Sequence, residues 1–361
     1  MFGIVLSGGG SKGAYEIGVW KAIRKLGIKY DLVTGTSVGA LNAALMCQND
    51  YYKALHFWRK LTFEDVVDVK INSKEKKEIY KTYFKGAIKG GMTINNLENT
   101  VNKAISTKKI YKSKINIGII TFNLKTLKPL KLIKRGIPKN KFKDYLIASA
   151  SCFPAFTKKV IDDRTFIDGG IYDNLPINLA IDMGATEIIA VDLKEIGIKQ
   201  KVKNKNIPIT YISPKNDIGS FLIFDSKIAK RAIRLGYNDT LKTYHKLEGN
   251  KYTFKDLKKN YYSKIENNKE LKKYLKKDSY ETYLSLIDEL GSIFEIDDSY
   301  IYHIKKFNKL IKKKLDLIPL VEKPKRNTKE IIKYLCSNLD DKKYQKQYKK
   351  EYLYALYIMG W

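Results

Sequence analysis

The chain carries a serine at the centre of a G-x-S-x-G sequence, an arrangement that can present a serine nucleophile for acyl transfer. Ser37 stands between Gly35 and Gly39, after an apolar segment of strand length (31–34) and before a helix-like segment of small residues (40–46). A strand that turns sharply into a helix holds the residue at the bend in a strained backbone, with its side chain exposed. The positive end of the helix dipole favours an anion at the same place. Because the motif is common by chance, other parts of the chain must decide whether this serine is catalytic.

A second candidate lies at the N-terminus, where an apolar strand (2–7) runs into a glycine-rich loop (8–13) and then into a helix-like segment (14–26). Backbone N–H groups in such a loop point towards an anion, and no Cβ atom blocks its approach. The loop fits G-x-G-x-x-G, which could hold a dinucleotide pyrophosphate. It could equally hold the oxyanion that forms when a serine attacks an ester. We favour the oxyanion. A bound dinucleotide needs an acidic residue at the end of the second strand, to bind the ribose. Asp31 begins that strand instead, and Ser37 stands at its end.

A third motif supplies a carboxylate that could act as a base. Asp168 ends a short apolar segment and is followed by Gly169 and Gly170. A carboxylate held within hydrogen-bond reach of a serine can accept its proton. An alternative is a turn in which the same side chain caps a helix that starts near 174–176.

The histidines decide between a triad and a dyad. The chain has three, and none has the setting at a strand end or glycine loop that a catalytic triad requires. They are His56, His245 and His303. We therefore favour a dyad of Ser37 and Asp168 over a triad.

Together and in this order, the three motifs resemble the patatin-like phospholipase family. The resemblance extends to the segment ahead of the acid (147–156) and to two segments behind it (168–176 and 184–191), and it covers residues 1–245. It implies a three-layer α/β/α core, Ser37 as the nucleophile, Asp168 as its base, and hydrolysis of acyl esters in lipids. It also implies an oxyanion hole and glycines that support the motifs. The oxyanion-hole residues are Gly8, Gly9 and Gly10, and the supporting glycines are Gly13, Gly35, Gly39, Gly169 and Gly170.

Two positions depart from the family pattern. Ser7 stands where family members often carry an acid, and Lys12 stands where many carry arginine. Lysine keeps the positive charge but lacks the planar fork of a guanidinium group, which weakens the case for a bidentate contact with phosphate or carboxylate.

Strands that alternate with helices must position these motifs. Further strands are expected at 115–122, 127–133, 187–193 and 207–212, and helices at 94–105, 142–149, 178–183 and 221–246. Such alternation predicts a mostly parallel sheet covered by helices on both faces. The serine would then lie beyond the carboxyl ends of the strands, where open α/β sheets bind their ligands.

The charge of the chain indicates a diffuse attraction to anionic surfaces. The net charge is +31, and residues 241–361 hold 28 basic and 17 acidic side chains, which leaves +20 for the first 240 residues. The charge is therefore spread evenly and forms no groove for nucleic acid, and no nucleic-acid motif is present. We expect a membrane phospholipid or another acyl lipid as substrate, an anionic membrane surface as partner, and no nucleic acid; the oligomeric state is left open.

Other features narrow the class of protein. The three cysteines, Cys47, Cys152 and Cys336, are odd in number and far apart, which indicates reduced thiols. No His/Cys cluster has metal-ligand spacing, and the chemistry requires no metal or organic cofactor. The N-terminal residues do not form a secretory signal, and no apolar run is long enough to span a membrane. We therefore expect a cytoplasmic protein, with peripheral attachment to a membrane as an option.

The composition changes beyond residue 245, which predicts a patatin-like domain over 1–245 and a Lys/Tyr-rich, mostly helical region over 246–361 that packs on the core or faces the membrane. Of the 26 tyrosines, 15 fall in 241–361. An apolar stripe among lysines at 301–315 could lie on a membrane surface, but we favour packing within its own domain. The last segment (352–361) could be an interfacial anchor or could close over an acyl pocket.

The sequence thus predicts a serine acyl hydrolase of the patatin-like type that acts on phospholipids or related lipids. Two other classes stay open. One is a catalytically silent lipid-binding protein of the same fold, and the other is a nucleotide-binding protein that uses the 8–13 loop.

Overall fold

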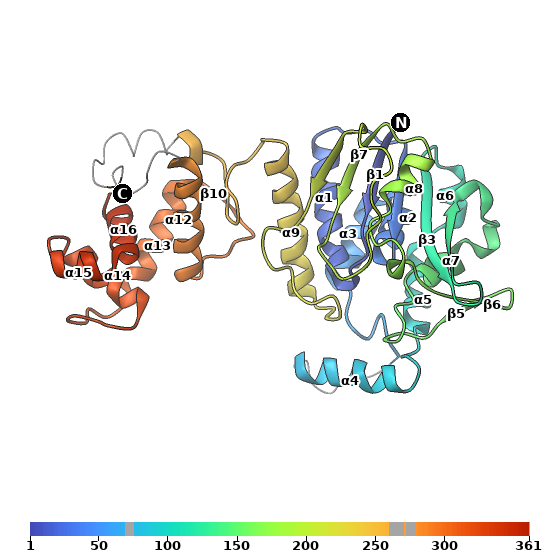
Figure 1. Cartoon of the computed structure of the whole chain (residues 1–361), viewed down its shortest axis with the longest axis horizontal. Coiled ribbons are helices and arrows are strands. Elements are labelled where there is room, and N and C mark those ends of the chain that lie inside the picture. The colour runs from blue at the N-terminus through green and yellow to red at the C-terminus, as the bar shows by residue number, and fades with distance from the viewer. Residues whose placement is uncertain (69–75, 260–270, 272–278, 361) are drawn as a thin grey trace. The chain divides into compact units, whose positions relative to one another are not determined.

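The computed structural model describes residues 1–68, 76–259, 271 and 279–360. The chain divides into two compact units, Met1–Thr240 and Leu241–Trp361 (Figure 1). Each unit has its own hydrophobic core. The predicted motifs all lie in the N-terminal unit.

A mostly parallel sheet forms the centre of the N-terminal unit. Its strand order is β5-β6-β3-β2-β1-β7-β8, and β4 pairs with β3. The strands are β1 (Phe2–Leu6), β2 (Leu32–Thr36), β3 (Asn116–Asn123), β4 (Lys128–Ile133), β5 (Lys159–Ile161), β6 (Arg164–Asp168), β7 (Glu187–Val191) and β8 (Ile209–Ile212). The pairs among β1, β2, β3, β7 and β8 are parallel, whereas β4, β5 and β6 pair antiparallel. Each strand predicted from the sequence is present, displaced by a few residues at its ends.

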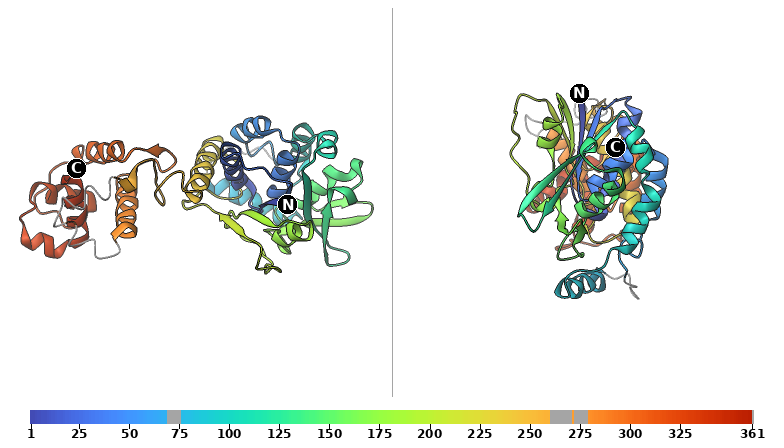
Figure 2. Two further views of the ribbon diagram at one scale, coloured as in Figure 1. Left: turned by 90° about the horizontal axis from the view of Figure 1, so that it is seen from above. Right: turned by 90° about the vertical axis from the view of Figure 1, so that its right-hand side faces the viewer.

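Helices cover both faces of this sheet, as the sequence predicts. In the right-hand view of Figure 2, blue and teal helices from the first part of the chain gather on one side of the sheet. On the other face, apolar residues of α8 pack against residues of the sheet in one buried cluster. The helices are α1 (Ala14–Lys25), α2 (Val38–Cys47), α3 (Tyr51–Lys60), α4 (Lys76–Ile88), α5 (Asn95–Ala104), α6 (Thr107–Lys112), α7 (Phe142–Ser149), α8 (Ile177–Asp182) and α9 (Ser226–Thr243). The predicted three-layer α/β/α class is confirmed.

The register of the sheet brings two distant strand ends together. Thr36, the last residue of β2, lies opposite Ile120 of β3, and Asp168, the last residue of β6, lies opposite Thr121. Because β4 pairs with β3 along 118–123, β2 and β6 share the other edge of β3, end to end. The residue that follows β2 therefore meets the residue that ends β6.

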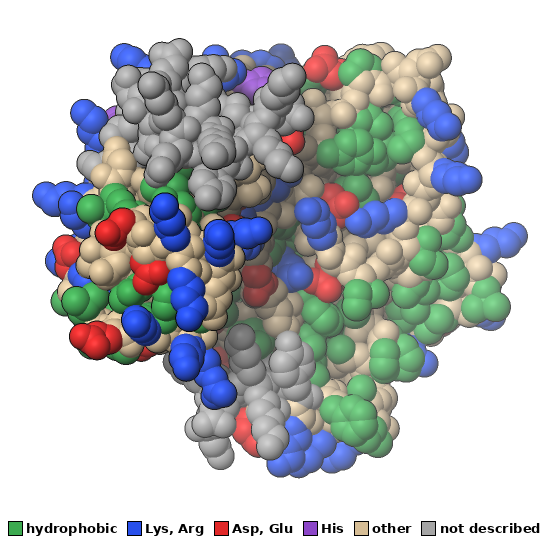
Figure 3. All heavy atoms as spheres, turned by 60° about the vertical axis from the view of Figure 1, so that its left-hand side comes forward, with side chains coloured by type: hydrophobic (Ala, Val, Ile, Leu, Met, Phe, Trp, Pro, Cys, Tyr) green, Lys and Arg blue, Asp and Glu red, His purple; other side chains and the backbone are tan. Residues whose placement is uncertain are grey.

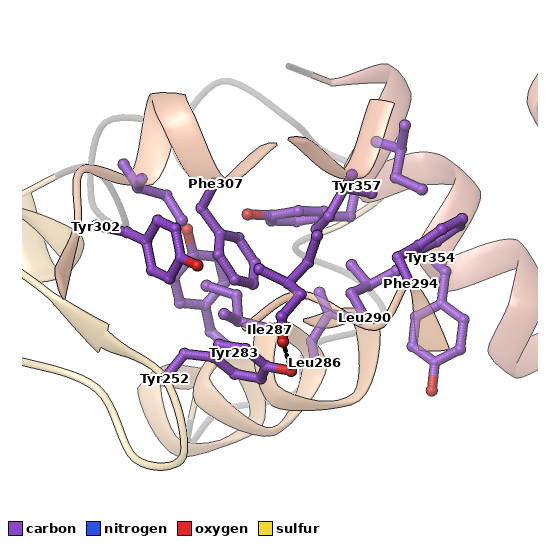
Figure 4. Packing of buried hydrophobic residues seen from close by; sticks show 14 of the residues in the cluster. Tyr252, Tyr283, Leu286, Ile287, Leu290, Phe294, Tyr302, Phe307, Tyr354 and Tyr357 are labelled. Carbon is purple, nitrogen blue, oxygen red and sulfur yellow. Dashed lines mark hydrogen bonds between the residues drawn. The ribbon is translucent and has the colours of Figure 1, made fainter. Parts of the chain in front are cut away.

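The C-terminal unit is helical and has an aromatic core. Its elements are β9 (Thr253–Phe254), α12 (Ser279–Ile293), β10 (Ile301–Tyr302), α13 (Ile304–Asp316), α14 (Thr328–Ser337), α15 (Lys342–Gln347) and α16 (Lys349–Met359). Figure 4 shows tyrosines, phenylalanines and leucines of this unit packed around one another. Edge-to-face packing of such rings adds stability beyond the burial of their area.

The burial of side chains in the C-terminal unit tests two predicted membrane contacts, one by residues 301–315 and one by residues 352–361. The apolar stripe of α13 is buried in the core of its own unit, which confirms the interpretation that we favoured for 301–315. Tyr354, Tyr357 and Ile358 of α16 are buried in the same core, so these side chains are not available to anchor in a membrane interface. Trp361 lies outside the described residues. No helix in the described parts of the chain combines the length and apolar character needed to cross a bilayer.

Candidate active site

Ser37 occupies a strained bend between β2 and α2, as its motif predicts. Its backbone has φ 56° and ψ −130°, a conformation that is rare for residues with a side chain. The flanking glycines permit close packing: a Cβ on Gly35 would overlap the carbonyl of Gly39, and a Cβ on Gly39 would lie 2.5 Å from the carbonyl oxygen of Leu6. The bend is also held by Ser149 of α7. Its hydroxyl accepts a hydrogen bond from the Ser37 N–H at 2.9 Å and donates one to a carbonyl of β3 at 2.7 Å.

Asp168 lies against the serine, at the end of β6. The residue is 6% exposed, and its carboxyl accepts a hydrogen bond from the Gly170 N–H at 2.7 Å. The Ser37 side chain acts on the same carboxyl as a hydrogen-bond donor that lowers its pKa. Burial raises the pKa of Asp168 to about 6, although the two hydrogen bonds act in the opposite direction. A Cβ on Gly169 would overlap the carbonyl of Ile120, so the turn after the acid requires glycine there.

The alternative capping role of Asp168 is partly present. Its carboxyl caps a short 3-10 turn over Gly169–Ile171, through the bond to Gly170. It does not cap the helix that follows, because α8 begins after Pro176. The same carboxyl therefore holds its own turn and contacts the serine hydroxyl.

The glycine-rich loop faces the serine, but its first residue is already engaged. The Gly8 N–H donates to the carbonyl of Asn174 at 3.0 Å, which leaves it unavailable to an oxyanion. The N–H groups of Gly9 and Gly10 make no hydrogen bond within the described residues, and both glycines line the same cavity as Ser37. The structure therefore differs from the expectation for Gly8, and of the three expected donors only Gly9 and Gly10 keep an N–H group without a partner among the described residues.

Close packing explains the glycines at either end of this loop. A Cβ on Gly8 would overlap the side-chain oxygen of Asn174, and a Cβ on Gly10, where φ is 54°, would overlap the carbonyl of Phe221. A Cβ on Gly13 would lie 2.6 Å from Cγ2 of Val38. The loop is thus packed tightly against three separate segments, at Asn174, Phe221 and the start of α2.

Sequence reasoning missed two residues that hold the site together. Asn174 lies between the glycine loop and the acid's turn: its side-chain N–H donates to the carbonyl of Gly8 at 3.4 Å, and a Cβ on Gly170 would lie 2.9 Å from its oxygen. Ser149 supports the serine backbone. Both lie in segments that carry the family resemblance, which is the only signal in the sequence that points to them.

Lys12 is directed towards a carboxylate of the protein. Its ammonium group lies 2.5 Å from Glu195, whose side chain lines the cavity. The hydroxyl of Ser7 accepts a hydrogen bond from the Leu193 N–H at 2.9 Å and so fastens β1 to the segment after β7. The two positions that depart from the family pattern therefore both contact residues 193–195.

Ser37 and Asp168 open into a cavity of about 710 Å³. Its wall is mainly apolar and comes from α2, α3, α5 and the loops near residues 153, 197 and 222. Cavities of this size and character bury most of the surface of a small apolar ligand. None of the three histidines lines it.

A buried polar network supports one wall of the cavity. The Asn42 side chain donates to Glu16 at 2.7 Å and to the carbonyl of Gly13 at 3.0 Å, and it accepts from the Trp58 ring at 2.9 Å. Burial raises the pKa of Glu16 well above its usual range. The network joins α1, α2 and α3 behind the glycine loop.

Neither a disulfide nor a metal centre is found in the parts that the structure describes. All three cysteines are free thiols. Among the described residues, no group of three His, Cys, Asp or Glu side chains could hold a metal ion.

The chain is an α/β protein with a cavity at the carboxyl ends of its parallel strands. Residues 4–181 match the family model described as "Patatin-like phospholipase". The N-terminal unit of the chain therefore belongs to the patatin-like phospholipase family, as the sequence predicts.

Curated relatives match about half of the chain. "Patatin-like phospholipase domain-containing protein 7" of Rattus norvegicus is 26% identical over 190 residues, and "Neuropathy target esterase sws" of Drosophila melanogaster is 29% identical over 198 residues. Each match spans 53% of this chain but only 13% of the relative. Among solved structures, VipD from Legionella pneumophila is 14% identical with a TM-score of 0.43, over 99% of this chain and 88% of that chain.

Proposed function

We propose that the protein is a serine acyl hydrolase that cleaves acyl esters of phospholipids or related lipids. The observation that carries the proposal is the meeting of Ser37 and the buried Asp168 carboxyl at the wall of an apolar cavity, where the Ser37 side chain acts on the acid as a hydrogen-bond donor that lowers its pKa. A serine that contacts a buried base, close to backbone N–H groups able to hold an anion, has the groups that acyl transfer requires.

The first half of the reaction acylates the serine. The Asp168 carboxylate accepts the Ser37 proton as Oγ bonds to the ester carbonyl carbon. The negative charge that develops on the carbonyl oxygen is held by the N–H groups of Gly9 and Gly10, each worth about 2.7–4 kcal/mol of barrier if it acts like other oxyanion donors. The bond to the alcohol oxygen then breaks, and the proton on Asp168 passes to the leaving alcohol.

The second half releases the acyl group. Asp168, ionised again, accepts a proton from water as the water oxygen bonds to the acyl carbon, and the tetrahedral charge is held as before. The bond to Oγ breaks, Ser37 regains its proton, and a fatty acid leaves. A carboxylate with a pKa of about 6 is a stronger base than one with the usual value near 4, and this supports the role of Asp168.

The lining of the cavity favours an acyl chain as the group bound beside the serine. Each methylene removed from water contributes about 0.8 kcal/mol, so an apolar wall holds a hydrocarbon chain without a specific contact. The ion pair of Lys12 with Glu195 gives Lys12 a partner within the protein. We therefore assign substrate binding mainly to the acyl chain.

Product analysis tests the proposal. Mixed phospholipid vesicles, and separately a soluble short-chain ester, are incubated with the unmodified chain and with Ser37→Ala, Asp168→Asn and Asp173→Asn. Asp173 is a matched control, because it is buried and burial raises its pKa to about 6, yet it does not line the cavity. We expect fatty acid or ester cleavage from the unmodified chain and Asp173→Asn only. Cleavage that survives both Ser37→Ala and Asp168→Asn would refute the dyad, and lipid binding without cleavage by any form would indicate a silent lipid-binding protein.

A further inference from the structure

Three isoleucines in the lining of the cavity expose much of their surface to solvent. Ile171 is 43% exposed, Ile196 is 91% exposed and Ile198 is 55% exposed, and all three line the cavity. A single exposed apolar side chain is ordinary, but several around one opening mark a surface that binds something apolar. We refer to these three residues as the isoleucine rim.

Backbone hydrogen bonds connect the isoleucine rim to the turn that follows Asp168. The Ile198 N–H donates to the carbonyl of Gly170 at 3.0 Å, and the Ile198 carbonyl accepts from the Asn174 N–H at 2.6 Å. Whatever binds the rim is therefore close to Asp168.

Helix α4 flanks the same cavity. The Tyr83 ring packs edge-on against Phe156, with ring centres 5.8 Å apart, and its hydroxyl donates to the carbonyl of Leu222 at 3.2 Å. Phe156 and Leu222 both line the cavity. Figure 1 shows α4 below the sheet, at the same end as β5 and β6.

The outer face of α4 is both apolar and basic. Lys81, Phe84, Lys85 and Ile88 follow the spacing that places residues on one side of a helix, and all four are exposed. Phe84 is 69% exposed and Ile88 is 72% exposed. Figure 3 shows hydrophobic and basic side chains together at the lower end of the molecule, where α4 lies.

We propose that the isoleucine rim and the outer face of α4 form the surface that docks on an anionic lipid bilayer. The proposal rests on the proposed function, because a hydrolase of membrane lipids needs its cavity to open onto the bilayer. Inserted isoleucines would let an acyl chain pass into the cavity without crossing water, and the lysines of α4 complement anionic headgroups. The stripe of α13 is excluded from this role, because its apolar side chains are buried in their own unit.

The two parts of the surface should contribute to binding in different ways. A lysine near an anionic membrane contributes a factor of about five to binding, so loss of Lys81 and Lys85 should weaken binding about 25-fold. The ion pair of Lys81 with Glu78, at 3.7 Å, is exposed and does not cancel this attraction. An inserted isoleucine contributes a factor of about 10 or more, independently of the lipid charge.

Vesicle flotation with the Ser37→Ala variant of the whole 361-residue chain measures binding without turnover. Two vesicle compositions are compared, phosphatidylcholine alone and phosphatidylcholine with phosphatidylserine. In this background, Lys81→Gln combined with Lys85→Gln is compared with Lys305→Gln combined with Lys309→Gln, an equally spaced exposed pair on α13. Thermal melting confirms that each variant is folded.

The isoleucine rim is tested in the same assay. Ile196→Asp is compared with Leu317→Asp, whose parent side chain is 77% exposed on the C-terminal unit. We expect Ile196→Asp to weaken binding to both vesicle types at least 10-fold. We expect the α4 pair to weaken binding about 25-fold to anionic vesicles only, and the two control variants to bind as the parent does.

Three results would overturn the docking surface. The first is that the protein does not bind vesicles at all. The second is that the test and control variants lose vesicle binding to the same extent. The third is that the protein self-associates with rising concentration, and Ile196→Asp abolishes this self-association while vesicle binding persists. Hydrolysis of a soluble ester by the unmodified chain reports separately on the proposed function. If ester cleavage depends on Ser37 but vesicle binding does not depend on the isoleucine rim, the docking surface alone is refuted. If vesicle binding depends on the rim but no form of the protein cleaves ester, the proposed hydrolase function alone is refuted.

Discussion

Replacement of Asp168 by asparagine should stabilise the protein at neutral pH while it abolishes hydrolysis. The carboxyl is buried, and its ionised form is disfavoured there despite hydrogen bonds from Ser37 and Gly170. Asparagine has nearly the same shape, carries no charge and can still accept the hydrogen bond from Gly170. It therefore removes the unfavourable burial of charge together with the base.

The size of the gain follows from the pKa of Asp168. Burial raises it from 3.8 to about 6, and each pKa unit corresponds to about 1.4 kcal/mol, so the gain is about 3 kcal/mol. Because the folded pKa lies above the unfolded one, the folded protein holds the proton more tightly. The unmodified protein therefore loses stability as the pH rises from about 4 to about 6, and the lower stability persists above that range. The advantage of Asp168→Asn should be absent at pH 4, grow through this window and be complete at pH 7.5.

Urea denaturation at pH 4 and pH 7.5 measures this difference. The fluorescence of Trp20 and Trp58, both buried in the N-terminal unit, reports its unfolding, and a Trp361→Phe background removes the third tryptophan. Asp173→Asn should show a gain of the same sign, because the pKa of Asp173 is also raised to about 6, but should keep its activity. A gain for Asp168→Asn that is equal at both pH values, or no gain at pH 7.5, would show that burial of this charge is not what raises its pKa.

Three further outcomes are expected. The rate of cleavage of a soluble ester should rise with pH through about 6 and level off above 7, because only ionised Asp168 accepts a proton. A rate that is constant from pH 5 to 8 would contradict this expectation. Gly35→Ala should lower the free energy of unfolding by about 1–3 kcal/mol or more, because the added Cβ overlaps the backbone of the next helix. The control Gly136→Ala should not lower it, because the space around Gly136 is open, and the denaturation midpoints of the two variants measure the difference. Ser149→Ala should cost about 1–3 kcal/mol by leaving the Ser37 N–H without a partner, and should lower kcat more than it changes KM; unchanged kcat would exclude a positioning role.

The sequence alone determined the local parts of this protein. The bend at Ser37, the glycine loop and the turn after Asp168 were predicted because each depends on a few neighbouring residues with special backbone requirements. The alternation of strands and helices was predicted because the hydrophobic period changes along the chain. The stripe of α13 was visible for the same reason, although the pattern cannot show whether a membrane or a protein core covers it.

Only the tertiary structure decided which distant groups meet. Ser37 and Asp168 are about 130 positions apart, and they touch because β2 and β6 end at adjacent residues along one edge of β3, a register that no local pattern specifies. The engagement of the Gly8 N–H by Asn174, the support from Ser149 and the pKa of Asp168 likewise depend on partners and burial supplied by remote segments. Local residue types fix what each segment can do, whereas long-range pairing and exclusion of water fix which side chains act together.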